Sequence, residues 1–76
     1  MNKQQARRIR KAESLIQAAI AEIKAVTEAL PSDGPKSAWK YDLIHYQVEF
    51  TALLSSDHGE CGLSVILPKI EKEAHA

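Results

Sequence analysis

The chain has 76 residues, a formal net charge of zero and 45% hydrophobic residues, which is enough for one small domain, 1–76, and no more. A domain of this size buries only about 60% of the surface that its unfolded chain exposes, so its core is thin. Its single cysteine excludes an internal disulfide, and no apolar run approaches the ~20 residues of a membrane span. Because the chain also lacks a signal-peptide pattern, we expect a soluble protein in a reducing, cytoplasmic compartment.

Charge is distributed unevenly along the chain. Five basic residues precede the first acidic residue, Glu13, and residues 12–76 hold the other five basic residues and all ten acidic ones. We call residues 1–11 the basic head; its cations are Lys3, Arg7, Arg8, Arg10 and Lys11. This polarity favours an anionic partner for the head, such as nucleic acid, an acidic protein or the acidic body of a second copy.

The first predicted element is a long helix over residues 3–30, which contain no glycine or proline and are mostly good helix formers. Apolar residues recur there at alternating steps of three and four, as in the a/d seam of a coiled coil. The seam consists of Ile9, Ala12, Ile16, Ala19, Ile23, Val26 and Leu30. Leu15, Ala18 and Ile20 widen it toward the face of a globular bundle.

Turn-forming residues at 31–35 end this helix, and a second helix is predicted over residues 37–54. Its seam consists of Trp39, Leu43, Tyr46, Phe50 and Leu53. A short link between two such seams predicts an all-α protein, an antiparallel helical hairpin with a short third C-terminal element. We expect the large side chains of the second seam to pack against the small Ala12 and Ala19 of the first.

Residues 46–51 also alternate apolar and polar side chains, which is typical of a β-strand. The alternative fold is therefore α+β, with a small β-hairpin at about 44–67 and Pro68 opening a terminal helix. Residues 55–62 should form a loop. We favour a helix for the third element, capped by Asp57, with Glu60 completing a capping box, and kinked at Pro68.

Groups that bind metals or act as nucleophiles are few and scattered. His58, Cys61 and His75 lack the paired spacing of a structural zinc site, and no base with an orienting partner lies near Cys61 in the sequence. There is no glycine-rich phosphate loop. We therefore predict no metal, no cofactor and no enzymatic activity.

Apolar surface without a partner is the feature that points to function. A second helix of 18 residues covers ~27 Å, whereas a first helix of 28 residues extends ~42 Å, which leaves an overhang of ~15 Å. A second apolar stripe lies on the other side of residues 41–52. The predicted interface combines these surfaces and consists of Ile9, Ala12, Ile16, Ile20, Tyr41, Ile44 and Val48.

Two functions follow as hypotheses. The first is a coiled-coil-like protein interaction module that self-associates and acts as an adaptor or inhibitor by occupying a surface of a larger protein. The second is a nucleic-acid accessory factor that clamps phosphates with the basic head. Cations at a helix N-terminus oppose the helix dipole, so their presence there favours a use, although no aromatic residue interleaves with them for base stacking.

Overall fold

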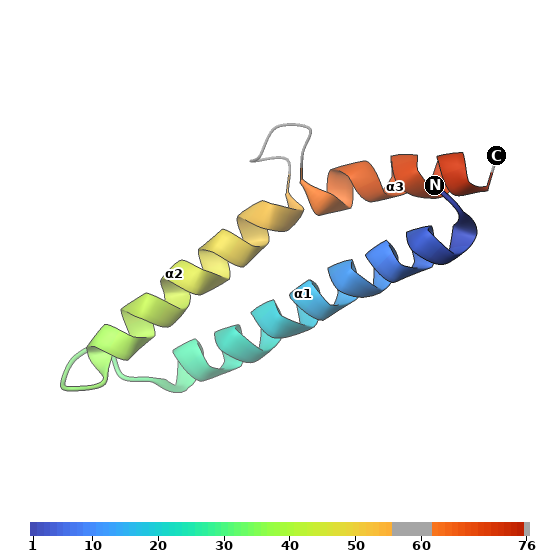
Figure 1. Ribbon diagram of the computed structural model, residues 1–76. Helices are drawn as coiled ribbons and strands as arrows, with labels where there is room; N and C mark the ends of the chain where they lie inside the picture. The colour runs from blue at the N-terminus through green and yellow to red at the C-terminus, as the bar shows by residue number, and fades with distance from the viewer. Residues whose placement is uncertain (56–61, 76) are drawn as a thin grey trace.

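The computed structural model describes residues 1–55 and 62–75, which form three helices. Helix α1 spans Lys3–Ala29, α2 spans Ser37–Leu54 and α3 spans Leu63–Ala74. Helices α2 and α3 follow one another along the same edge of α1, both antiparallel to it (Figure 1). The predicted all-α hairpin with a third element is confirmed, and the β-hairpin at about 44–67 is wrong for the described residues, because 44–54 and 63–67 are helical.

The basic head belongs to α1, because that helix begins with a capping box. The Asn2 side chain accepts a hydrogen bond from the Gln5 N–H at 2.8 Å, and the Gln5 side chain accepts one from the Asn2 N–H at 3.0 Å. These bonds satisfy two of the donors that a helix start leaves unpaired. The helix ends at Leu30, whose extended dihedrals (φ −83°, ψ 144°) are those that a following proline favours.

The turn between α1 and α2 is held by bonds at both of its ends. Gly34 adopts φ +90°, which favours glycine, and its carbonyl accepts hydrogen bonds from the Ser37 N–H (3.1 Å) and hydroxyl (2.7 Å). The Lys40 ammonium donates to the Leu30 carbonyl at 3.0 Å, so a cation sits at the negative end of α1. The turn predicted at 31–35 is therefore also the docking point for the start of α2.

Helix α3 starts at a close backbone crossing. Gly62 caps the helix, and a Cβ atom built there would lie 2.9 Å from the Leu54 carbonyl oxygen and in collision with the Ser55 carbonyl. Only glycine fits where α3 passes the end of α2. Pro68 lies inside α3, as in the favoured prediction, and removes one helical hydrogen bond. The cap predicted from Asp57 and Glu60 lies outside the described residues.

The buried side of α1 differs from the predicted seam. The isoleucines and leucine of that seam are half-buried as expected, but the second line beside them is Ala6, Glu13, Ile20 and Thr27, of which all but Ile20 are buried. Ala12 and Ala19 are also half-buried, whereas Val26 is exposed, so of the seam residues only Val26 was placed wrongly. We call Ala6, Glu13, Ile20 and Thr27 the inner line of α1.

Helix α2 is also rotated about its own axis relative to the predicted seam. Its half-buried or buried residues are Ser37, Lys40, Leu43, Gln47, Phe50, Ala52 and Leu54, of which Lys40, Gln47 and Leu54 form its inner line. Trp39, Tyr46 and Leu53 are exposed, so the predicted packing of these side chains on Ala12 and Ala19 is wrong; Leu43 and Phe50 are the seam residues that turn inward. Lys40 takes an inner position because its ammonium reaches the Leu30 carbonyl.

The three helices form a single layer. The molecule measures 55 × 22 × 12 Å, and its thickness is about the diameter of one helix, ~10–12 Å. Its radius of gyration is 15.8 Å, against about 11 Å for a globular domain of this length. Among the described residues only Leu67 has a fully buried side chain. Both broad faces of the layer are therefore open.

Replacing Leu67 should test whether this small core holds the helices together. Leu67 is 0% exposed, so Leu67→Ala should lower the free energy of unfolding by about 2–5 kcal/mol in urea titrations followed by circular dichroism. The control Val48→Ala removes an exposed side chain and should change it by less than about 0.5 kcal/mol. Equal effects of the two substitutions would contradict the assigned core.

Candidate interaction surfaces

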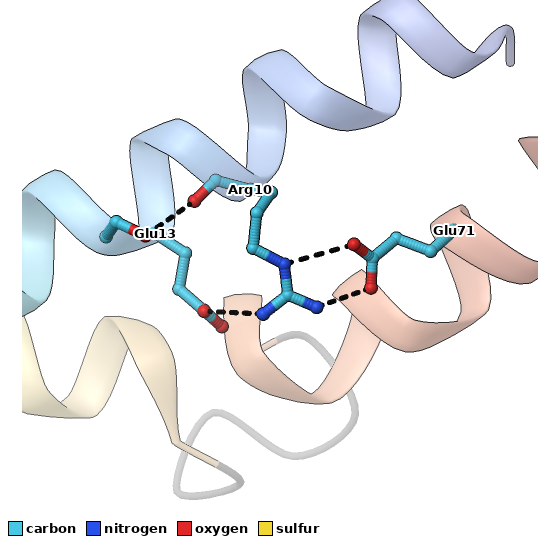
Figure 2. Close-up of polar contacts among 4 residues, drawn as sticks. Arg10, Glu13 and Glu71 are labelled. Carbon is cyan, nitrogen blue, oxygen red and sulfur yellow. Dashed lines mark hydrogen bonds and ion pairs between the residues drawn. The ribbon is translucent and has the colours of Figure 1, made fainter.

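A cluster of three charged residues joins α1 to α3 (Figure 2). Arg10 donates from Nε to Glu71 Oε2 at 3.0 Å and from Nη2 to Glu71 Oε1 at 2.5 Å, which is a bidentate pair. Its Nη1 donates to Glu13 Oε1 at 3.3 Å, so the guanidinium also partners a buried carboxylate. The hydrogen bonds from Arg10 lower the pKa of Glu71, and the same bonds raise the pKa of Arg10.

Because of this cluster, the N-terminal half of α1 is less exposed than predicted. Besides the Arg10–Glu71 pair, the N-terminal ammonium of Met1 lies 2.7 Å from Glu73 Oε1, so α3 is fastened along the N-terminal half of α1. Helix α2 is shorter than α1 as predicted, but the stretch of α1 that it does not reach is not unpaired, because α3 runs alongside it (Figure 1). What remains open is the two faces of the layer.

The basic head keeps four of its five cations free. Arg10 is engaged by Glu13 and Glu71, but no hydrogen bond or ion pair among the described residues involves Lys3, Arg7, Arg8 or Lys11, which are all exposed. Lys3, Arg7 and Lys11 recur every four residues and follow one side of the helix. The predicted nucleic-acid surface thus loses Arg10 to an internal role and retains the other four.

The predicted interface falls into two groups that the fold separates. Ile9, Ala12, Ile16 and Ile20 are half-buried along the edge of α1 that meets α2 and α3. Tyr41, Ile44 and Val48 are exposed on α2. Ile44 follows the inner-line residue Lys40 by four positions, just as Arg10 follows Ala6, which places it on the same face of the layer as the Arg10–Glu71 pair.

The opposite face of the layer carries a larger apolar patch. Trp39, Tyr46 and Leu53 each directly precede an inner-line residue of α2, and Ala12, Ala19 and Val26 each precede one of α1. In a pair of antiparallel helices, the residues directly before the two inner lines lie on the same side of the layer. The residues four positions after an inner-line residue lie on the other side. The Arg10–Glu71 pair, which joins two residues of the second kind, confirms this geometry.

We call this patch the apolar face; it consists of Ala12, Leu15, Ala19, Val26, Trp39, Tyr46 and Leu53. Its larger members are well exposed: Leu15 60%, Val26 49%, Trp39 62%, Tyr46 54% and Leu53 49%. Single exposed apolar residues are ordinary, whereas contiguous exposed apolar patches are typical of interaction surfaces. The sequence pattern predicts six of these residues to be seam members inside the fold and Leu15 to lie beside the seam.

The apolar face has a charged border and no charge at its centre. Arg8 and Glu22 lie along its α1 side, and Asp42 and Glu49 along its α2 side, at positions next to those of the apolar residues. All four are exposed, and none has a hydrogen bond or ion pair within the described part of the chain. An apolar centre containing aromatic residues and surrounded by polar groups is the usual composition of a protein–protein interface.

No family model, curated protein or solved structure matches the chain. Within residues 1–55 and 62–75 there is no group of three or more potential metal ligands, and no helix there has the length and apolarity to cross a bilayer. No pocket is present in that part of the chain. Residues His58 and Cys61 lie outside it.

The Arg10–Glu71 pair predicts a defined pH dependence of stability. Because the pKa of Glu71 is lower in the folded than in the unfolded chain, the pair stabilises the fold above the ordinary glutamate range near ~4.3 and is lost as pH falls through the folded-state pKa. Glu71→Gln should therefore destabilise the protein at pH 7, and the difference from wild type should shrink toward pH 3 in urea titrations.

The matched control is Glu28→Gln, which neutralises an exposed carboxylate of α1 that has no partner among the described residues. Its effect on stability should be small and should not follow the same pH course. If Glu71→Gln and Glu28→Gln gave the same difference from wild type at every pH, the Arg10–Glu71 contact would not contribute to the fold.

Proposed function

We propose that this chain is a non-catalytic protein interaction module of the cytoplasm that binds a second copy of itself and acts as an adaptor or inhibitor by covering a surface of a larger protein. The observation that carries the proposal is the apolar face, which exposes a tryptophan, a tyrosine and three large aliphatic side chains on a layer one helix thick. Tryptophan and tyrosine are the residues most enriched at the energetic centres of interfaces.

The accessible surface supports the same conclusion. The chain exposes 5584 Å², whereas a compact monomer of its mass exposes about 4,600 Å². The surplus of about 1,000 Å² is surface that further association would remove from water, at roughly 25 cal/mol per Å² of apolar area. A domain with so small an interior gains stability when a partner binds its folded form.

Two separate faces allow two kinds of partner. The apolar face is the larger surface, and Tyr41, Ile44 and Val48 expose a second apolar stripe on the opposite side of α2. When the apolar face is occupied by a second copy, the second stripe stays accessible to a different protein. This division is what an adaptor or inhibitor needs, because self-association and target binding then use different residues.

Light scattering after size-exclusion chromatography tests the self-associating part of the proposal. We expect a mass of at least two chains at micromolar concentration, falling toward one chain on dilution, because association is governed by mass action. A single-chain mass across the whole range up to millimolar concentration would contradict it.

A second candidate function rests on the four free cations of the basic head. Binding through phosphates alone should retard DNA or RNA in gel shifts at about 50 mM salt and disappear near 200 mM. The triple variant Lys3→Gln, Arg7→Gln, Lys11→Gln should lose this shift, and the control Lys24→Gln, outside the head, should keep it. No shift by wild type at low salt would eliminate this function.

A further inference from the structure

We propose that a second copy of this chain covers the apolar face, with the two α1 helices antiparallel and crossing near Leu15 and each α2 lying over the α3 of the other copy. This proposal rests on the self-association in the proposed function and specifies its geometry. The juxtaposition that carries it is an apolar face that spans α1 and α2, with opposite charges placed symmetrically about Leu15 along its α1 side.

The dimensions of the layer fit such a pairing. Helix α1 has 27 residues, so its midpoint lies at Ile16, next to Leu15 on the apolar face. Helices α2 and α3 border the two halves of α1 (Figure 1). A two-fold axis that lies between the layers and crosses α1 at its middle therefore brings α1 onto α1 and α2 onto α3 along the full length of the molecule, as an isologous interface requires.

The exposed area is sufficient for a stable dimer. A standard interface buries about 800 Å² on each partner. The chain exposes 5584 Å², about 1,000 Å² more than a compact monomer of this mass, and its thickness of 12 Å would double in a two-layer dimer. The second copy supplies the second layer that most domains build from their own chain.

Charge placement selects the antiparallel orientation. Arg8 and Glu22 lie seven residues before and after Leu15, so all three share one side of α1. In the antiparallel arrangement Arg8 of each copy meets Glu22 of the other, which gives two ion pairs per dimer. A parallel arrangement would instead place Arg8 against Arg8 and Glu22 against Glu22, and like charges in contact disfavour it.

The side chains of the apolar face agree with this arrangement. The small Ala12 and Ala19 flank Leu15 and let two α1 helices approach closely at their crossing. Trp39, Tyr46 and Leu53 lie in succession along α2 and would cover the α3 of the second copy, where Ile66 precedes the inner-line residue Leu67 and is half-buried.

A charge swap tests the orientation. Arg8→Glu and Glu22→Arg should each raise the dimer dissociation constant about tenfold or more, because each creates two like-charge contacts per dimer. The double variant Arg8→Glu, Glu22→Arg should return it to within about threefold of wild type. The control Glu28→Arg, an exposed residue outside the apolar face, should leave it unchanged, and circular dichroism checks that every variant is helical.

Cross-linking tests the position of the axis. In a Cys61→Ser background, Leu15→Cys should form a covalent dimer with oxidised glutathione, because the two thiols meet at the axis, whereas Gln17→Cys should not. A dimer that neither the charge swap nor Leu15→Cys affects would overturn this geometry and leave the proposed self-association intact. A wild-type chain that stays monomeric would overturn both.

Discussion

The central constraint on this protein is that the apolar residues of α1 and of α2 extend around more of each helix than one neighbouring helix can cover. On α2, apolar side chains point inward (Leu43, Phe50), onto the apolar face (Trp39, Tyr46, Leu53) and onto the opposite face (Ile44, Val48). A helix with so wide an apolar surface is normally covered by protein on more than one side. In a layer 12 Å thick it has neighbours on one edge only, so the remaining apolar surface is available for other chains.

Polar residues on the side of each helix that turns inward are accommodated by hydrogen bonds. Lys40 reaches the Leu30 carbonyl, Thr27 donates to the Lys24 carbonyl at 2.9 Å, and Glu13 receives a hydrogen bond from Arg10, so three polar residues are accommodated on the inner lines. Among the described side chains no buried polar atom lacks a hydrogen-bond partner. These bonds satisfy the polar groups of the inner lines, while the residues of the apolar face lie outside.

The helices themselves could be predicted from the sequence, because glycine and proline at 31–35 and 59–62 delimit them. The apolar residues from 39 to 53 follow the period of a helix, despite the local alternation at 46–51. The rotation of the helices could not be predicted, since periodicity places the most apolar line inward and does not register the bonds of Lys40 or Glu13. The coverage of α1 by α3 depends on Arg10 and Glu71, which are 61 residues apart. The residues of the apolar face were thus identified from sequence, but their exposure was not.

The dependence of folding stability on chain concentration tests this account most directly. Urea unfolding curves recorded by circular dichroism across a hundredfold range of chain concentration should shift, with the midpoint rising as concentration increases, because burial of the apolar face by another copy stabilises only the folded chain. A midpoint that stays constant across the whole range would show that the folded chain is not stabilised by binding another copy. It would contradict the claim that a second copy covers the apolar face.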